Sequence, residues 1–315
     1  MSNLPKISIV TPSYNQGEFL EQCIDSLLCQ NYPNLEYIIM DGGSSDNSVE
    51  IIKKYQERLA YWRSRPDDGH YAAVQEGFDL STGDIMGWLN SDDMFHPNGL
   101  YLVGNIFAQN PEVQWITGKR VGFDAEGDLL SYGYEKQTWC RDRLLDRAFV
   151  DKHVFVMQEA TFWRRGLWEK AGSLLDLSFD PAADFELWLR FSRYARLYTV
   201  DALLAGFRYH GASQRSQLGR EEYIAQCKRA IARERQISRE ISRYDAVPPP
   251  LIEWRQSGRS VQVQVRAPLP PEISGENEDG PVSSGCLSTD SPQRFSVKMR
   301  YFLRRLVRLS RRVLR

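Results

Sequence analysis

Strand-like and helix-like segments alternate through the first hundred residues of this chain. Short apolar runs are followed by segments with apolar residues at helical spacing. The expected strands are Lys6–Thr11, Leu35–Met40, Leu59–Arg63 and Asp84–Leu89. The expected helices are Phe19–Leu28, a segment that begins at Asn47 or Ser48 and runs through Tyr55, and Tyr71–Leu80. Such alternation predicts an α/β fold, a mostly parallel sheet with helices on both faces.

The pattern from residue 111 to 245 is less regular. We expect strands at Gln114–Phe123 and Leu129–Tyr134, which could pair, and at Val154–Gln158, Tyr198–Val200 and Leu204–Tyr209. We expect helices at Thr161–Ala171, Asp184–Tyr194 and Glu221–Arg243, the last polar and solvated. Residues 1–245 are interpreted as one domain with halves of about 1–110 and 111–245.

The composition changes at Ala246. Residues 246–294 are rich in Pro, Gly, Ser and acids, which predicts a linker with little structure apart from a possible short strand at Val261–Val265. Residues 295–315 carry eight Lys and Arg and no acid, and a helical wheel separates the basic from the apolar side chains. This pattern predicts a basic amphipathic helix on an anionic membrane surface. Docking on the protein's own acidic surface, or on a partner, is the alternative.

The charge balance and the cysteines restrict partners and location. The chain has 40 Lys and Arg against 41 Asp and Glu, so a chain-wide nucleic-acid footprint is not expected. No apolar run reaches about 18 residues, and the N-terminus lacks the pattern of a signal peptide. Five scattered cysteines without CxxC spacing argue against a disulfide framework or a zinc site. We therefore expect a cytoplasmic protein attached peripherally to the inner face of the membrane.

Acidic side chains follow three of the four expected strands. Asp41 follows the second strand, Asp67 and Asp68 follow the third, and Asp92 and Asp93 follow the fourth. Ligands of open parallel sheets bind at the carboxyl ends of the strands, so these carboxylates are expected to converge. A bound cation relieves their repulsion, and Mg²⁺ or Mn²⁺ prefers oxygen ligands together with substrate phosphates. Since the GxGxxG and GxxxxGK[ST] motifs are absent, the pattern favours a metal-bridged nucleoside diphosphate.

Two longer segments carry a family resemblance. ISIVTPSYNQGEFLEQCIDSLLCQNYPNLEYIIMDGGSSDNS and STGDIMGWLNSDDMFHPNGL resemble the family 2 nucleotide-diphospho-sugar glycosyltransferases, and the likeness covers about residues 5–210. It implies a GT-A fold with a nucleotide-binding first half and an acceptor-binding second half. It also implies metal-dependent, inverting transfer of a sugar, from a UDP-sugar in the first instance. The acceptor would be a hydroxyl of a glycan or lipid-linked molecule in bacterial surface polysaccharide synthesis.

The resemblance also implies roles for individual residues. The nucleotide would be bound by Thr11, Pro12, Ser13, Tyr14, Asn15, Asp41, Asp68, Tyr71, Asn90, Ser91, Arg208 and Ser213. The divalent cation would be bound by Asp92, with Asp93 second and His210 as a further ligand. The sequence departs from the family pattern at Gly42, Asn90 and Ala183, where acidic residues are usual.

The expected catalytic base is Asp184, in a segment that resembles the family's ED-x-x-LW-x-R motif. A carboxylate within reach of the acceptor hydroxyl can take its proton. Glu186 is the second candidate for the base, and capping of a helix is the structural alternative for Asp184. Likewise, Asp41 could shape a turn, and Asp92 and Asp93 could cap a helix that starts near Pro97.

Three tryptophans near the expected base, Trp163, Trp168 and Trp188, are interpreted as core rather than as a sugar platform. Two other functions share parts of the pattern. A nucleotidyltransferase would have the same sheet and acidic metal site, but usually a Gly-rich loop with a Lys after the first strand. A binding protein for nucleotide sugars, without catalysis, remains open because of the three departures.

Overall fold

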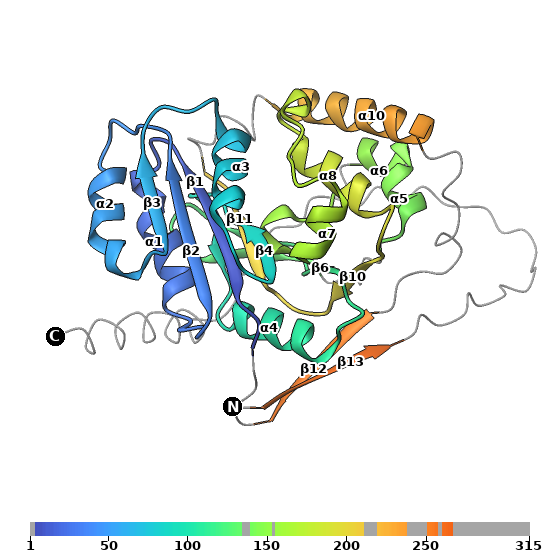
Figure 1. Ribbon diagram of the computed structural model, residues 1–315, viewed down its shortest axis with the longest axis horizontal. Helices are drawn as coiled ribbons and strands as arrows, with labels where there is room; N and C mark the ends of the chain where they lie inside the picture. Colours follow the sequence, from blue (N-terminus) through green and yellow to red (C-terminus); the bar gives the residue numbers. More distant parts are fainter. Residues whose placement is uncertain are drawn as a thin grey trace, which may run out of the picture. The chain divides into compact units, whose positions relative to one another are not determined.

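The computed structural model describes residues 4–133, 139–152, 155–210, 219–237, 251–257 and 260–266. In this part of the chain, nine strands form one sheet in the order β13-β12-β10-β6-β9-β4-β1-β2-β3 (Figure 1). The first four strands are β1 (Ile7–Ser13), β2 (Leu35–Asp41), β3 (Tyr61–Ser64) and β4 (Ile85–Trp88). They pair in parallel, so their carboxyl ends lie at one edge of the sheet. All four were predicted from the sequence.

The second half extends the same sheet. Its strands are β6 (Trp115–Thr117), β9 (Thr161–Arg164), β10 (Leu197–Val200), β12 (Leu251–Ser257) and β13 (Ser260–Arg266). β9 runs antiparallel between β4 and β6, whereas β10 is parallel to both β6 and β12. The two halves of the domain therefore share one continuous, mostly parallel sheet.

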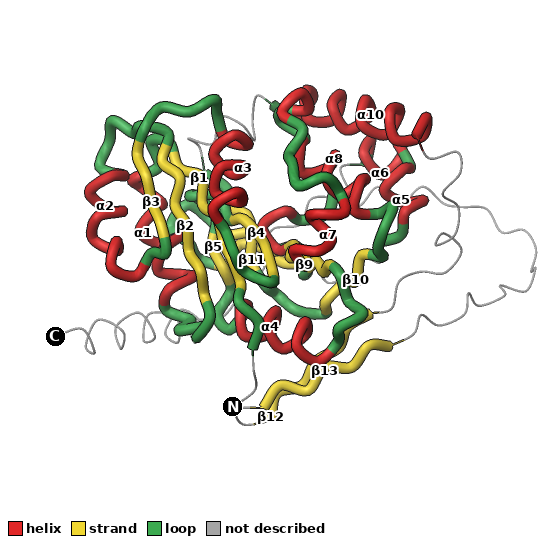
Figure 2. The backbone as a smooth tube through the Cα atoms, in the orientation of Figure 1, coloured by secondary structure: helices red, strands yellow, loops and turns green. Residues whose placement is uncertain are grey.

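Helices cover both faces of the sheet, as predicted (Figure 2). One face packs against α1 (Gly17–Leu28), α2 (Ser48–Tyr55) and α4 (Gly99–Gln109). The other packs against α3 (His70–Leu80), α7 (Arg165–Lys170) and α8 (Ala183–Phe191), and α10 (Arg220–Ile237) packs in turn on α8. Alternate strand residues supply the two cores: Ile9 faces the first set of helices, and Val10 faces the second.

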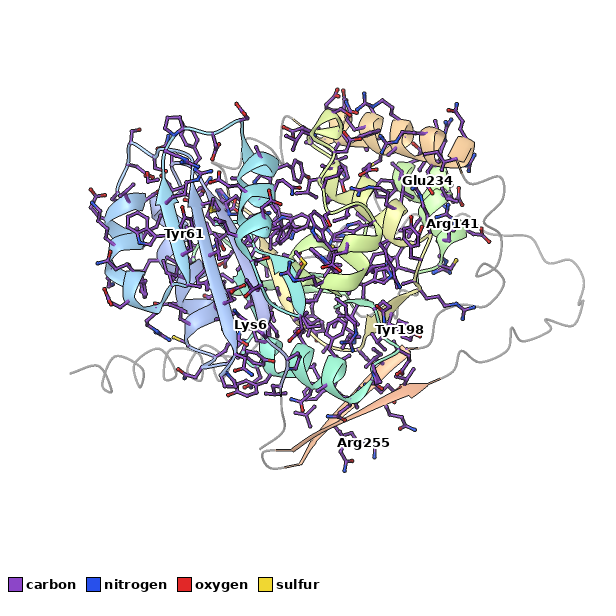
Figure 3. All side chains as sticks on the ribbon, viewed as in Figure 1. Lys6, Tyr61, Arg141, Tyr198, Glu234 and Arg255 are labelled. Carbon is purple, nitrogen blue, oxygen red and sulfur yellow. The ribbon has the colours of Figure 1, made fainter. Side chains whose placement is uncertain are left out.

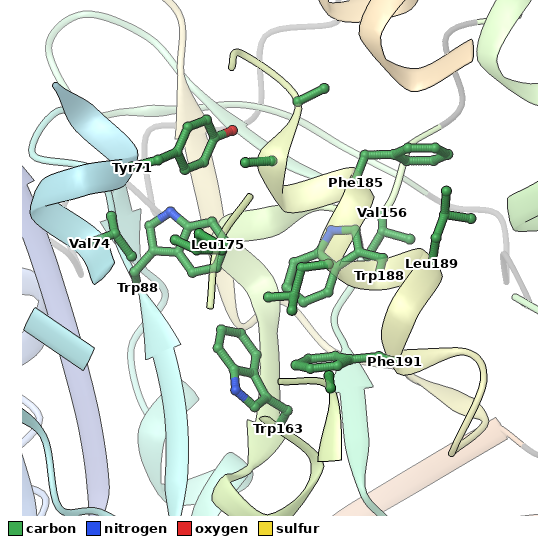
Figure 4. Close-up of a cluster of buried hydrophobic side chains, with 14 of the residues drawn as sticks. Tyr71, Val74, Trp88, Val156, Trp163, Leu175, Phe185, Trp188, Leu189 and Phe191 are labelled. Atoms are coloured by element: carbon green, nitrogen blue, oxygen red, sulfur yellow. The ribbon is translucent and has the colours of Figure 1, made fainter. Parts of the chain in front are cut away.

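The core between the sheet and α8 is unusually aromatic (Figure 4). Trp88, Trp163 and Trp188 are each no more than 2% exposed, and their ring centroids lie 5.5–5.9 Å apart. Trp168 is 3% exposed. The interpretation of these tryptophans as core is confirmed.

A smaller sheet lies beside the large one. Its order is β5-β11-β7-β8, with β5 (Met94–Phe95), β7 (Val121–Phe123), β8 (Leu129–Tyr132) and β11 (Ala205–Arg208). β7 and β8 pair antiparallel, which matches the expected pairing of their segments. However, Gln114–Phe123 is not one strand, because the chain turns at Gly118 and gives β6 to one sheet and β7 to the other. A side chain at Gly118 would meet Leu204 at 2.9 Å.

The segment Thr161–Ala171 also differs from its prediction as a helix. Its first four residues form β9, and the helix α7 begins only at Arg165. Thr161, Phe162 and Trp163 are β-branched or aromatic and fully buried, so pairing between two strands suits them better than an amphipathic helix does. The strand expected at Val154–Gln158 is absent from its described residues: 155–157 have no regular structure, and Gln158–Ala160 form the 3₁₀ helix η2.

The long polar helix α10 is not a solvated helix throughout. Glu234 is 2% exposed and forms an ion pair of 2.6 Å with Arg141 of the short helix α5 (Arg141–Leu145). Both residues are labelled in Figure 3. Arg233 pairs with Glu186 of α8. The remaining short elements are α6 (Arg147–Asp151), η1 (Gln56–Arg58) and η3 (Leu177–Phe179). Charged pairs therefore fix α10 against α8.

Residues 251–266, which the sequence analysis assigned to a linker, form a hairpin that extends the large sheet. β12 pairs with β10 and with β13, and Val261, Val263 and Val265 pack against the α4 core. The alternation of valine and polar residues in 260–266 was the signal for this strand. The rest of the expected linker and the helix 295–315 lie outside the described residues. In the described part, no helix is long and apolar enough to cross a bilayer.

Candidate active site

The loops after β1, β2 and β4 meet at the carboxyl edge of the sheet. Asn15 joins the first two loops: its side-chain Oδ1 accepts a hydrogen bond of 2.8 Å from the Ser45 amide. Its own amide donates to Ser44 Oγ at 2.8 Å. Asn15 adopts φ of +51°, a value that asparagine tolerates better than most residues. This side chain sets the shape of the rim.

The other residues of the first loop divide into a buried and an exposed group. Thr11, Pro12 and Ser13 are buried in β1, and Thr11 Oγ1 lies 3.1 Å from the Tyr37 hydroxyl. Tyr14 is 63% exposed. Among the predicted nucleotide residues of this loop, Tyr14 is thus the one that presents a large side chain to a ligand.

Asp41 shapes the turn after β2. Its carboxylate accepts hydrogen bonds from the amides of Gly43 and Ser44, at 3.1 and 2.9 Å, and from the hydroxyls of Ser44 and Ser64, at 2.5 and 2.6 Å. The side chain is fully buried. The turn interpretation, which the sequence left open, therefore describes the contacts of Asp41 in the structure.

A carboxylate that the sequence analysis did not select lies next to Gly42. A Cβ atom at Gly42 would lie 3.3 Å from both carboxylate oxygens of Asp67 and 3.3 Å from Tyr14. Asp67 and its neighbour Asp68 are both exposed, and the Asp67 carboxylate is held by Arg63 at 3.3 Å. Asp67 thus brings a carboxylate to the place where the resemblance predicts an acidic side chain at position 42.

The loop after β4 contains an acid–histidine pair. The Oδ2 atom of Asp92 lies 3.0 Å from Nε2 of His210, and the Asp92 side chain is 16% exposed. The His210 ring packs against Phe19 at 4.1 Å. Neither Asp92 nor Asp93 caps α4, whose N-cap is Asn98.

Asp93 is fully buried, unlike Asp92. Its two oxygens accept hydrogen bonds from the Arg208 amide, at 2.9 Å, and from Asn90 Nδ2, at 3.0 Å. Burial first, and then the charges of Asp92 and Glu159, raise the pKa of Asp93 well above its usual value. Ser91 is also buried, at 4% exposure. Asp93 and Asn90 therefore fix the loop that presents Asp92.

Arg208 was predicted to contact the diphosphate, but its side chain is fully buried. Its guanidinium donates to the Asp92 carbonyl at 2.6 Å, to Gln22 Oε1 at 2.7 Å and to the Ala125 carbonyl at 2.9 Å. Its place is behind the loop, where it holds the Asp92 backbone. Ser213, the other residue predicted near the diphosphate, lies outside the described residues.

Asp184 lies in the first turn of α8 and is 7% exposed. Two phenol groups face its carboxylate: Tyr71 donates to Oδ1 at 3.2 Å, and Tyr223 of α10 donates to Oδ2 at 3.2 Å. Burial raises the pKa of Asp184 to about 6. Tyr71, predicted to contact the nucleotide, thus lies against the predicted base.

The carboxylate of the alternative base, Glu186, is paired with two arginines. Its carboxylate pairs with Arg190 at 2.9 Å and also with Arg233, and the side chain is 2% exposed. A buried carboxylate held by two guanidinium groups is not free to contact an acceptor hydroxyl. Since the N-cap of α8 is Ala182, the capping alternative for Asp184 does not apply either. The geometry favours Asp184.

Glu159 was missed by the sequence analysis. It lies in η2, is 4% exposed, and its Oε1 atom has no hydrogen-bond partner in the described part of the chain. Burial raises the pKa of Glu159 to about 7, and the charges of Asp184 and Asp92 act in the same direction. Glu159 therefore lies within electrostatic range of both predicted ends of the site. The signal for Glu159 in the sequence was its position as a charged residue directly before a buried strand.

A model of a protein family, described as glycosyl transferase family 2, matches residues 8–169. This chain belongs to that family. The prediction from the sequence is confirmed, and membership disfavours the nucleotidyltransferase alternative.

Among curated relatives, an uncharacterized glycosyltransferase of Rickettsia typhi is 28% identical over 210 residues, 66% of this chain and 65% of the relative. An uncharacterized glycosyltransferase of Mycobacterium tuberculosis is 29% identical over 214 residues, 66% of this chain and 76% of the relative. Hyaluronan synthase of Pasteurella multocida is 25% identical over 215 residues, 67% of this chain. The match spans only 21% of that synthase.

Two solved structures show the same fold. S. aureus TarS 1-349 in complex with UDP-GlcNAc has a TM-score of 0.56 at 17% identity and covers 67% of this chain and 61% of its own. The mannosyltransferase PcManGT from Pyrobaculum calidifontis, in complex with GDP-Man and Mn²⁺, has a TM-score of 0.50 at 16% identity. The match covers 77% of this chain and 77% of the PcManGT chain. The predicted GT-A type fold is confirmed.

Proposed function

We propose that this protein transfers a sugar from a nucleoside-diphosphate sugar to an acceptor hydroxyl, with inversion at the anomeric carbon and with a divalent cation. The observation that carries the proposal is the pair of carboxylate positions on one rim. Asp92, beside His210, marks the leaving-group end, and Asp184, beside two phenols, marks the acceptor end. An inverting displacement needs one base opposite one stabilised leaving group.

On the nucleotide side, Tyr14 and Asp67 are the side chains best placed to meet the base. Tyr14 is exposed, and both lie 3.3 Å from the position that a Cβ atom at Gly42 would occupy. An ionised carboxylate accepts hydrogen bonds from base N–H groups, and the uracil ring of a UDP-sugar has such a group. The complexes of TarS with UDP-GlcNAc and of PcManGT with GDP-Man support a nucleotide sugar as the class of donor.

The residues present fit a divalent cation. In the described part of the chain, no three His, Cys, Asp or Glu side chains are close enough to form a metal site of their own. Mg²⁺ and its analogues, however, commonly take one or two protein ligands and complete their shell with phosphate oxygens and water. Asp92 and His210, whose Oδ2 and Nε2 atoms lie 3.0 Å apart, would hold such a cation from the protein side.

Asp184 would act as the general base. The acceptor oxygen attacks the anomeric carbon, its proton passes to the Asp184 carboxylate, and the bond from the anomeric carbon to the diphosphate oxygen breaks. A base with a pKa of about 6 is ionised at neutral pH yet basic enough to assist. When bound, the cation would neutralise charge on the departing diphosphate.

The acceptor and the location of the protein remain proposals from the sequence. A glycan or lipid-linked acceptor fits a peripheral membrane protein, and residues 295–315 are the proposed attachment. Sedimentation with anionic and with neutral vesicles tests this. The full chain should bind the anionic vesicles, and a chain that ends at Pro292 should not. Equal sedimentation of the two chains would contradict membrane attachment.

Calorimetric titration of UDP, with Mn²⁺ and then with EDTA, tests the metal and the donor. The wild type should bind UDP only with Mn²⁺, and Asp92→Asn should lose most of that difference. Asp142→Asn, an exposed carboxylate on α5, is the matched control and should behave as the wild type. Equal affinity with Mn²⁺ and EDTA would contradict the metal. Release of UDP from a panel of UDP-sugars then separates an enzyme from a binding protein.

A further inference from the structure

Glu159 is held in a fixed place by the ends of two strands. The neighbouring Gln158 donates its side-chain amide to the Trp88 carbonyl, at the end of β4, at 2.7 Å. On the other side, the Ala160 carbonyl accepts a hydrogen bond of 2.9 Å from the Gly118 amide, after β6. The backbone that carries Glu159 is therefore as rigid as the sheet itself.

The surroundings of the Glu159 carboxyl do not explain it as a structural group. It is 96% buried, and Oε1 has no partner in the described residues. Its electrostatic neighbours are the acids Asp184 and Asp92 and the arginine Arg120. Arg120 donates instead to the Tyr209 hydroxyl, at 3.0 Å. The backbone amide of Glu159 is the hydrogen-bond donor to this carboxyl, and Oε1 is left without one. A buried carboxyl oxygen without a donor is unfavourable, so such an atom in a native protein calls for a functional explanation.

The reaction assigns a ligand to this position. In the proposed displacement the anomeric carbon lies between the leaving diphosphate, at Asp92, and the acceptor oxygen, at Asp184. Glu159, next to Gln158 at the end of β4 and within electrostatic range of both acids, therefore borders the space of the transferred sugar ring. The hydroxyls of a sugar supply the hydrogen-bond donors that Oε1 lacks.

We propose that Glu159 binds a hydroxyl of the transferred sugar and thereby restricts the donor to uncharged sugars. The restriction follows from charge, because a uronic acid would add a fourth carboxylate to Asp92, Asp184 and Glu159 in a buried space. This inference rests on the proposed function and names the class of sugar for the same site.

Binding measurements test the inference without a known acceptor. UDP, UDP-glucose, UDP-galactose, UDP-N-acetylglucosamine and UDP-glucuronate are titrated with Mn²⁺ into the wild type and three variants. Glu159→Ala removes the carboxyl, Glu159→Gln removes its charge at nearly equal size, and Glu169→Gln changes an exposed residue of α7 as the control. The quantity compared is the affinity of each UDP-sugar relative to that of UDP.

In the wild type, we expect at least one neutral UDP-sugar to bind more tightly than UDP, and UDP-glucuronate to bind less tightly than UDP-glucose. Glu159→Ala should lower the relative affinity of the neutral donor about 5- to 50-fold, the range for a lost hydrogen bond to a polar or charged group. Glu159→Gln should reduce the discrimination against UDP-glucuronate at least several-fold. UDP itself should bind all variants within about twofold.

Two other results have different meanings. If UDP does not bind the wild type, the UDP-sugar donor of the proposed function is wrong. If UDP binds but the relative affinities of the sugars are the same in the wild type, Glu159→Ala and Glu159→Gln, the inference about Glu159 is wrong and the proposed function is unaffected. An equal loss of affinity for UDP and all UDP-sugars would assign Glu159 to the loop structure and would also overturn the inference.

Discussion

At the nucleotide end of the site, the buried carboxylates accept hydrogen bonds from the chain that surrounds them. Asp41 receives four and Asp93 receives two, and main-chain amides are among the donors in both cases. At the acceptor end, Asp184 has two phenols at 3.2 Å, and between the two ends one oxygen of Glu159 has no partner in the described residues. The comparison teaches that acids of one rim divide into those that build loops and those available to a substrate.

The largest expected effect is on turnover. Asp184→Asn should lower kcat about 10²–10⁴-fold, because the amide cannot accept the acceptor's proton. The affinity for UDP should change little, since Asp184 lies on the acceptor side. Steady-state kinetics and calorimetry measure the two quantities. Near-normal turnover, or a loss of UDP affinity in place of turnover, would remove Asp184 as the base.

The next effect is on stability, at the other end of the site. Asp41→Asn should lower the free energy of unfolding by about 2–4 kcal/mol, because one oxygen that accepts from amides and hydroxyls becomes a donor. Urea denaturation measures it, with Asp142→Asn as the control at about 0.5 kcal/mol or less. A fully stable Asp41→Asn protein would show that this carboxylate is not needed for the turn.

Asp184→Asn should have the opposite effect on stability at neutral pH. Burial raises the pKa of Asp184 to about 6, so ionisation of the folded state costs stability above that pH. A shift of about two units corresponds to at most about 3 kcal/mol, and we expect a gain of about 1–3 kcal/mol at pH 7.5. The gain should shrink as the pH falls below 6, because the wild-type carboxyl is then protonated. Urea denaturation at a series of pH values tests this sign.

The smallest effect concerns the phenols. Tyr223→Phe removes a hydrogen bond that lowers the pKa of Asp184, so the acidic limb of the kcat profile should move to higher pH by less than about one unit. At pH 8, where the base is ionised in both proteins, kcat should fall less than about tenfold. A limb at the same pH in both proteins would show that Tyr223 does not tune the base.

The sequence predicted the features that local patterns determine better than those that depend on tertiary packing. The strands β1–β4 follow directly from apolar runs bounded by turns, and Asp184 follows from its motif. The local pattern did not separate strand from helix at Thr161–Arg164, because its aromatic residues suit either when both sides are buried. Of the hairpin, β13 was expected as a short strand at Val261–Val265, whereas its partner β12 was hidden by the Pro-rich segment before it.

Roles that depend on tertiary packing were the ones missed. Asp67 and Asp68 are adjacent, and only the position of Gly42 distinguishes them. Tyr223 of α10 contacts Asp184, which lies 39 residues earlier in the chain. The ion pairs that fix α10 against α8 are not visible in any local motif. Arg208 was predicted from its motif to bind phosphate. Its burial behind the Asp92 loop depends on Gln22 and Ala125, which are distant in sequence, so the local sequence did not reveal it.

The tryptophan cluster provides an optical consequence. Trp88 ends the strand that leads to the Asp92 loop, Trp163 follows Glu159 by four residues, and Trp188 lies one turn after Asp184. Indoles 5.5–5.9 Å apart couple their electronic transitions, so their near-ultraviolet circular dichroism depends on mutual orientation. Trp188 shares α8 with Asp184, and Trp88 and Trp163 each lie four residues along the chain from Asp92 and Glu159. Small rearrangements of these acids relative to one another are therefore expected to appear in the dichroism spectrum, without any added label.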